Sequence, residues 1–269
     1  MHPMLTIAIR SARKAGDFIA QSYHLQNSTE SSNKSRNDFV TCLAQGAERQ
    51  VIDVIKKYYP KHSIIAKHCG ERIGDDRDVQ WVIDPLGGVA NFIKCLPHFA
   101  ISVAVRIKEH TEVAAIYDPV RNELFTAVRG QGAQLNGYRL RVIAAQKRDL
   151  RTATLVTALS VNSRQHSASY LNIFNKLFMQ CTDMNSSGSS VLDLAYVAAS
   201  RVDGFFGVGL EPRDFIGGEL LIRESGALIT DFTGNHNYYD SGNVVAGNSN
   251  VVKAMLQTIR EESSEALKR

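Results

Sequence analysis

The stretch QWVIDPLGGVANF, residues 80–92, has the layout of a binding site but few reactive atoms. An apolar run ends in a single carboxylate, Asp84, and Pro85 then leads into the glycine pair Gly87 and Gly88. A strand that delivers an acid to a turn and a helix start is a common way to build a metal or phosphate site. One acid without a hydroxyl makes a poor catalytic site, which raises the question of whether the chain is an enzyme.

The first half of the chain is predicted to form two helices and a mostly antiparallel series of strands. Apolar residues recur at helical spacing over 4–23 and over 44–59, and Pro60 stops the second helix. The polar stretch 26–37 between them is expected to be a loop. The remaining patterns predict strands at 63–66, 80–84, 99–107, 112–117 and 123–128, and a hairpin turn at Asn136-Gly137.

After about residue 147 the pattern changes to alternating strands and helices. Strands are expected near 153–158, 203–207 and 227–231, and helices near 168–180, 189–200 and 214–226 and from about 249. Layers of helices and sheets follow from this alternation. Because no linker or low-complexity segment interrupts the chain, we expect two closely packed subdomains, an α+β unit over 1–147 with the mostly antiparallel sheet and an α/β unit over 148–269.

Composition bounds the class of protein. The chain has 269 residues, 44% of them hydrophobic, and its first residues mix basic side chains into the apolar pattern. We therefore expect a cytoplasmic protein with no membrane partner. A net charge of +4 without Lys/Arg runs gives no indication of sequence-specific nucleic-acid binding. The cysteines lack metal-binding spacing, so reduced thiols are expected at Cys42, Cys69, Cys95 and Cys181.

Four segments, in this order, resemble the inositol monophosphatase family. They are NDFVT at 37–41, WVIDPLGGVANF at 81–92, GSSVLDLAYVAASRVDGFF at 188–206 and EPRDFIGGELLIRESGALITDF at 211–232. The match runs nearly end to end and is closest to the bacterial SuhB-type branch. It implies a five-layered α/β/α/β/α sandwich of the inositol monophosphatase and fructose-bisphosphatase type, and usually a homodimer.

The resemblance also implies two activities. The family removes phosphate from inositol monophosphates with Mg²⁺, and the SuhB-type branch joins NusA and RNA polymerase in antitermination of ribosomal RNA transcription. In the phosphatase reaction, clustered acids hold magnesium ions that bind phosphate oxygens and lower the pKa of the attacking water. The state of those acids in this chain therefore decides which activity to expect.

Most of the acids that the family uses are missing from the matching positions. Lys67 stands where the family has a glutamate ligand of the metal, and Gly87 stands where it has a second aspartate ligand. Ala44 and Val89 replace the aspartate and the threonine that act on the attacking water. By this resemblance no catalytic residue is intact.

Three metal ligands of the family remain, namely Asp84, the Leu86 carbonyl and Asp214. Mg²⁺ requires near-octahedral oxygen coordination, and the Lys67 ammonium would oppose a cation, so Mg²⁺ binding is predicted to be weak or absent. An alternative interpretation is that both aspartates are helix N-cap or turn acids. We also hypothesise that Lys67 acts as a built-in cation between the two carboxylates.

The glycine-rich turns are the candidate contacts for phosphate or substrate. Backbone N–H groups bind anions whatever the side chains are, so phosphate or inositol phosphate binding without turnover is expected. The candidate residues are Gly88, Val89, Ala90, Gly188 and Ser189.

The sequence therefore leads to three hypotheses about function. The first is a catalytically impaired SuhB-type protein that binds other proteins in transcription antitermination or ribosome biogenesis. The alternatives are a weak Mg²⁺-dependent inositol-1-phosphate phosphatase and a regulatory partner that forms mixed dimers with an active paralogue.

Overall fold

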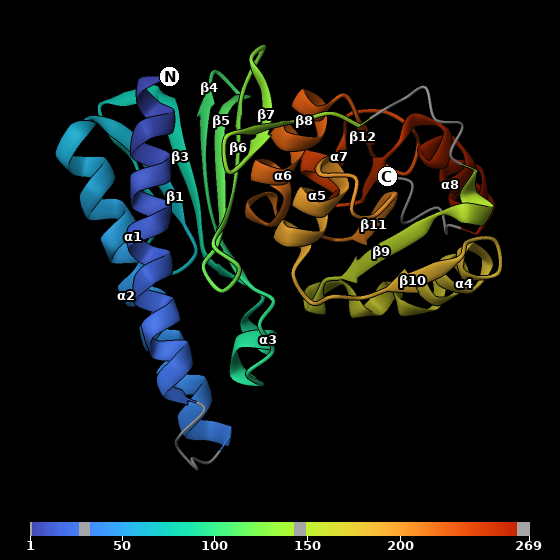
Figure 1. Cartoon of the computed structure of the whole chain (residues 1–269), viewed down its shortest axis with the longest axis horizontal. Helices are drawn as coiled ribbons and strands as arrows, with labels where there is room; N and C mark the ends of the chain where they lie inside the picture. The colour runs from blue at the N-terminus through green and yellow to red at the C-terminus, as the bar shows by residue number, and fades with distance from the viewer. Residues whose placement is uncertain (1, 27–32, 143–148, 263–269) are drawn as a thin grey trace.

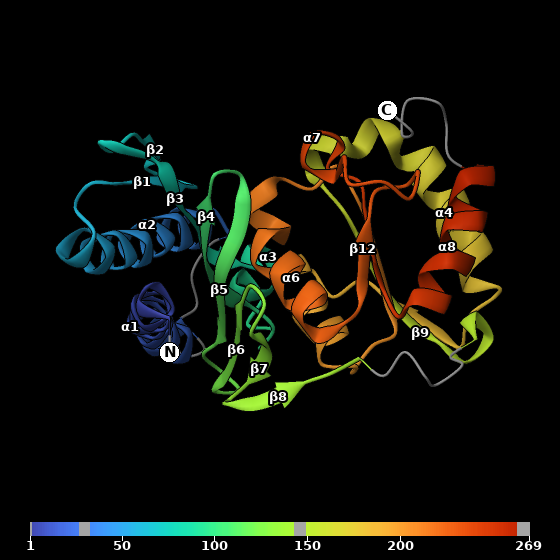
Figure 2. The same cartoon turned by 90° about the horizontal axis from the view of Figure 1, so that it is seen from above.

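The protein forms five alternating layers of helices and sheets, seen edge-on in Figures 1 and 2. The structure is a computed structural model that describes residues 2–26, 33–142 and 149–262. From one end to the other the layers are a helix pair, an eight-stranded sheet, a second helix pair, a five-stranded sheet and a third helix pair. The five-layered α/β/α/β/α sandwich expected from the sequence is confirmed.

The outer helix pair consists of α1 (Pro3–Gln26) and α2 (Asn33–Tyr58), which pack on one face of the first sheet. The predicted loop over 26–37 is wrong for its last part, because α2 already begins at Asn33. No glycine or proline interrupts 33–37, so no residue there breaks a helix. Residues 27–32 lie outside the described residues.

The first sheet runs in the order β2-β1-β3-β4-β5-β6-β7-β8. Within the described residues β1 pairs with β3 in parallel and the other neighbours are antiparallel. The predicted hairpin turn is confirmed, because Asn136 and Gly137 both have positive φ angles, 49° and 85°. The strands are β1 (His62–Ala66), β2 (Gly70–Arg72), β3 (Asp76–Gly87), β4 (Ala100–Ile107), β5 (His110–Asp118), β6 (Glu123–Val128), β7 (Gly132–Leu135) and β8 (Tyr138–Leu140).

The middle layer contains α5 (Ser190–Ala198) and α6 (Pro212–Ser225), which lie between the two sheets. A glycine pair in α6 allows this close packing. A Cβ added to Gly217 would lie 2.6 Å from Ser102 Oγ of β4, and one added to Gly218 would lie 2.5 Å from Leu194 Cβ of α5. Larger residues at either position would push α6 away from its neighbours.

The second sheet runs in the order β10-β9-β11-β13-β12, and α4 and α8 cover its outer face. Its five strands are β9 (Thr154–Leu159), β10 (Asp183–Asn185), β11 (Gly204–Val208), β12 (Leu228–Thr230) and β13 (Val244–Gly247). The outer helices are α4 (Ser167–Phe178) and α8 (Ser249–Glu262), and the short helices are α3 (Val89–Ile93), η1 (Leu150–Thr152), η2 (Val161–His166) and α7 (Tyr238–Ser241).

Apolar side chains fill the spaces between the layers. One cluster lies between the outer helix pair and the first sheet, another around α5 and α6, and a third between the second sheet and its outer helices. No helix in the described ranges is both long and apolar enough to cross a membrane.

Candidate functional site

A cavity of about 310 Å³, here called the candidate cavity, lies where the end of β3, the turn before α5 and the start of α6 meet. Two predicted site residues are not part of its lining: Ala44 lies on the buried face of α2, and Ala90 is exposed on α3. The other predicted site residues all line it, namely Lys67, Asp84, Leu86, Gly87, Gly88, Val89, Gly188, Ser189 and Asp214.

Asp84 lies at the buried end of β3 and is 2% exposed. Its Oδ1 accepts one hydrogen bond, from the Leu86 N–H at 3.2 Å, so its carboxyl group closes a short turn. The pKa of Asp84 is raised to about 6, because burial and the nearby Asp214 raise it by more than the positive charge of Lys67 lowers it. A carboxyl with one backbone donor retains acceptor capacity toward the cavity.

The glycine pair after Asp84 is explained by lack of space. Gly88 has a φ of 110°, and a Cβ there would lie 2.8 Å from the His98 carbonyl oxygen. A Cβ at Gly87 would lie 2.8 Å from Asp84 Oδ2, so the Asp84 carboxylate leans over the glycine. An aspartate at position 87 would require Asp84 to turn away.

Hydrogen bonds join the two sides of the cavity. Ser189 donates its hydroxyl to the Gly87 carbonyl at 2.9 Å, and the Asn91 amide donates to the carbonyls of His98 and Ser187 at 2.8 Å each. The α3 helix that begins at Val89 has only five residues, so its dipole is small. The anion cradle predicted on its N–H groups stays a prediction.

Asp214 occupies the first turn of α6 and caps it. Its Oδ2 accepts the N–H of Glu211 at 3.1 Å, and its own N–H donates to the Glu211 carbonyl at 2.8 Å. Burial raises the pKa of Asp214, whereas its hydrogen bond to Glu211 and the charges of Arg213 and Lys67 lower it. One carboxylate oxygen of Asp214 is therefore already used by the helix start.

Lys67 is exposed in the turn after β1. That turn is held by Glu48, a residue that the sequence analysis did not identify. Glu48 is fully buried on α2, and its carboxylate accepts the N–H groups of His68 at 2.9 Å and Cys69 at 2.7 Å. A glutamate on the buried stripe of the predicted helix 44–59 was the available signal. Glu48 thus fixes the turn that brings Lys67 to the cavity.

The donor set does not fit the family's magnesium centre. Asp84, Asp214 and the Leu86 carbonyl offer few oxygen ligands, and an ammonium lines the same cavity. Across 2–26, 33–142 and 149–262, no three His, Cys, Asp or Glu side chains group closely enough to hold a metal ion. Magnesium requires near-octahedral oxygen coordination, so this arrangement does not supply a well-defined site.

The sequence model of the inositol monophosphatase family matches residues 1–265. The chain belongs to the inositol monophosphatase family. Two proteins named Nus factor SuhB, from Salmonella typhimurium LT2 and Escherichia coli K12, are each 60% identical to it over 269 residues, which is 100% of both chains compared. The similarity therefore spans the outer helices, both sheets and the cavity.

A solved relative has the same fold. The native crystal structure of the extragenic suppressor protein suhB from Bartonella henselae superposes with a TM-score of 0.87 at 28% identity. The match covers 96% of this chain and 98% of that chain. The layered scaffold is thus retained in this chain although Lys67, Gly87 and Val89 occupy its cavity.

Proposed function

We propose that this chain is a SuhB-type protein-binding factor in transcription antitermination and ribosome biogenesis, with little or no phosphatase activity. One observation carries the proposal: the candidate cavity keeps its scaffold but presents only Asp84 and Asp214 as acids, beside Lys67. The name Nus factor borne by relatives that are 60% identical supports the binding role.

The chemistry of the cavity explains the expected loss of hydrolysis. The aliphatic side chains of Val89 and Ala44 hold no proton acceptor or hydroxyl that could position a water. Without well-held magnesium, the cavity lacks the divalent cation that lowers the pKa of that water and neutralises the leaving alkoxide in the family reaction. Positioned proton transfer alone contributes about 10²–10⁴-fold to a rate.

The first experiment measures inositol-1-phosphate hydrolysis by the purified full chain over a magnesium titration. A family member that retains all its acids serves as the matched control under the same conditions. The expected turnover number is lower by about 10²-fold or more. A turnover number within about tenfold of the control would contradict the impaired-enzyme part and favour a weak phosphatase.

The second experiment restores the family residues together as Ala44→Asp, Lys67→Glu, Gly87→Asp and Val89→Thr. Metal-dependent hydrolysis is expected from the quadruple variant but not from single variants, because groups that act as a unit are strongly non-additive. The quadruple variant can fold into an active arrangement only if the Asp84 side chain turns away, because it occupies the space that a side chain at position 87 needs. One single variant giving most of the gain would contradict a jointly dismantled site.

The binding role is tested by co-purification with NusA or RNA polymerase. Binding through the protein surface is expected to be insensitive to magnesium and to inositol phosphates, because the cavity is not the contact. The E. coli relative is the matched control. Absence of binding, with a positive control, would favour the mixed-dimer alternative over the antitermination role. Mass spectrometry of intact complexes then distinguishes mixed dimers with an active paralogue from the homodimer that the resemblance implies.

A further inference from the structure

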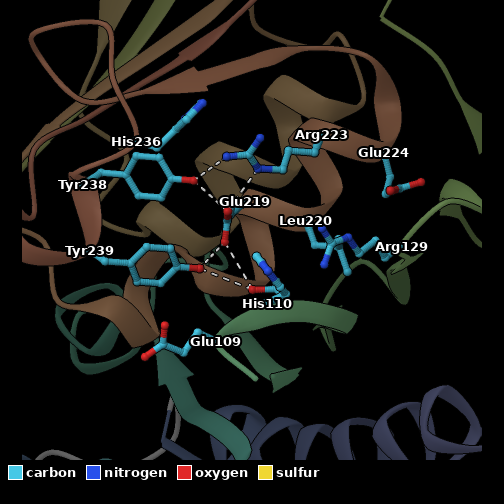
Figure 3. Close-up of a pocket in the computed structure, with 11 residues that line it drawn as sticks. Glu109, His110, Arg129, Glu219, Leu220, Arg223, Glu224, His236, Tyr238 and Tyr239 are labelled. Carbon is cyan, nitrogen blue, oxygen red and sulfur yellow. Dashed lines mark hydrogen bonds and ion pairs between the residues drawn. The ribbon is translucent and has the colours of Figure 1, made fainter. Parts of the chain in front are cut away.

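A second cavity of about 340 Å³ lies farther along α6, away from the helix start that carries Asp214. We call it the Glu219 cavity, and Figure 3 shows its residues. They come from the start of β5, the end of β6, the second half of α6 and the segment around α7. The lining consists of Glu109, His110, Thr111, Arg129, Glu219, Leu220, Arg223, Glu224, His236, Tyr238 and Tyr239.

Glu219 is the centre of a hydrogen-bond network that leaves its carboxylate saturated. Its Oε1 accepts the Tyr238 hydroxyl at 2.6 Å and the Arg223 Nε at 3.1 Å. Its Oε2 accepts the Thr111 hydroxyl at 3.2 Å and also the Tyr239 hydroxyl. With four donors on two oxygens, this buried acid is structurally satisfied and offers little to a ligand.

Other acids around the cavity are occupied in the same way. Glu224 accepts the N–H groups of Gly130 at 2.8 Å and Gly132 at 2.7 Å, one on each carboxylate oxygen. Glu112, just outside the lining, pairs with Arg129 Nη1 at 3.0 Å. Glu109 is the exception, since it is exposed at the rim. The wall of the cavity is therefore short of open acceptors.

The open polar groups are donors instead. Arg223 uses Nε for Glu219 and Nη2 for the Tyr238 hydroxyl at 2.7 Å, so Nη1 makes no hydrogen bond with the described residues. These two bonds hold the guanidinium in one orientation. Arg129 likewise commits Nη1 and is 48% exposed. Figure 3 shows His110 across Glu219 from Arg223, so donors reach the cavity from more than one side.

We propose that the Glu219 cavity binds a small anionic metabolite through a carboxylate or phosphate group held by Arg223 and Arg129. A planar guanidinium that is already fixed by protein contacts pairs with either oxyanion at low entropic cost. The volume is in the range of small-molecule sites. Both arginines already pair with a glutamate, and Glu109 at the rim makes no ion pair with the described residues and adds a further negative charge. Dissociation constants of only about 0.1–1 mM are therefore expected for simple probes.

The test uses calorimetric titration of the full chain at constant ionic strength with two probes, inorganic phosphate and citrate. The stronger of the two identifies the oxyanion class. Arg223→Gln is expected to weaken its binding by about tenfold or more. Arg151→Gln is the matched control, because Arg151 is an exposed arginine that pairs with Asp149 elsewhere, and its binding constant should equal that of the unchanged chain.

Two further variants keep the outcome decisive. Arg129→Gln removes the other arginine that the proposal names, at a half-exposed position, so it tests the cavity if Arg223→Gln fails to fold, and about threefold weaker binding is expected. Lys67→Met alters the candidate cavity, where phosphate binding is also predicted, so it separates the two cavities: only binding in the Glu219 cavity should persist unchanged in this variant. The proposal is overturned if neither probe binds at about 10 mM, if neither cavity variant weakens binding, or if Lys67→Met abolishes it.

Discussion

Asp193 on α5 and Asp231 after β12 are both buried, 1% and 5% exposed, but their surroundings differ. Asp231 accepts the N–H groups of Thr233, Asn235 and Asn237 at 2.8, 2.8 and 3.1 Å, and also the Thr233 hydroxyl at 2.7 Å. Although burial acts to raise its pKa, these hydrogen bonds bring the pKa of Asp231 below its usual value.

Asp193 lacks such a set of donors. Its Oδ2 is buried without a hydrogen-bond partner among the described residues. Burial raises the pKa of Asp193 to about 7, and a hydrogen bond with Ser187 offsets only part of this. Asp84, which lines the candidate cavity, is similarly short of donors. Burial alone therefore does not distinguish a structural carboxyl from one with unused acceptor capacity, whereas the number of hydrogen-bond donors does.

The largest effect is expected from Asp193→Asn as a function of pH. The folded pKa of about 7 exceeds the usual 3.8, so the folded state holds a proton that the unfolded state has released. Stability therefore falls as the pH rises from about 4 and is lowest above the folded pKa, with a total penalty of about 4 kcal/mol. Asn removes the penalty, so from pH 5 to 8.5 the variant should gain about 3 kcal/mol relative to the unchanged chain.

Urea unfolding of both proteins at pH 5, 7 and 8.5 measures this difference. The m-value should stay equal in the two proteins, so that the change reflects stability. If the difference in unfolding free energy did not change with pH, the Asp193 carboxyl would have more hydrogen-bond donors than described above.

Asp231→Asn should have the opposite sign and a smaller magnitude. The amide loses the charge that strengthens four hydrogen bonds and turns an N–H group toward one of the donors. The free energy of unfolding at pH 7 should fall by about 2 kcal/mol. Asp240→Asn, at an exposed residue of α7, is the control and should leave it unchanged. If Asp231→Asn and Asp240→Asn were equally stable, the hydrogen bonds of Asp231 would not stabilise the protein, and Asp231 would not differ from Asp193 in this respect.

The smallest effect is expected from Lys67→Met. Lys67 is exposed and favours the ionised forms of Asp84 and Asp214 from a distance, so its loss should cost about 1 kcal/mol or less. Removing the competing cation should also make the thermal midpoint rise with added magnesium. If stability and magnesium response are both unchanged, Lys67 merely replaces a metal ligand of the family and does not act as a built-in cation.

Sequence patterns predicted long elements well and short ones poorly. The apolar runs of β3 to β6 and the helical stripes of α1, α5, α6 and α8 are long enough to show their period. β2, β10 and β13 have three or four residues, too few for a period, and were missed, although the equally short β12 was predicted near 227–231. The start of α2 was misplaced because polar residues were taken to indicate a loop, although nothing at Asn33 breaks a helix.

Site residues were predictable where they fall in one continuous segment and not where only folding brings them together. The lining of the candidate cavity was predictable because Asp84 to Val89 and Gly188 to Ser189 fall in continuous family-like segments. The role of Glu48 was not, since its acceptor role depends on a turn about twenty residues away. The Glu219 cavity was not either, because Thr111 and Tyr239 meet Glu219 only in the tertiary structure.

The two hydrogen bonds of the Asn91 amide also bear on when the candidate cavity can form. One of them joins residues 96 positions apart, so the segment around Ser187, whose neighbours Ser186 and Gly188 line the cavity, reaches Asn91 only after a long loop has closed. Contacts of such separation form late and slowly, because chain entropy is lost before they are made. A nascent chain that ends before Ser187 therefore carries the turn after β3 but lacks the wall that completes its cavity.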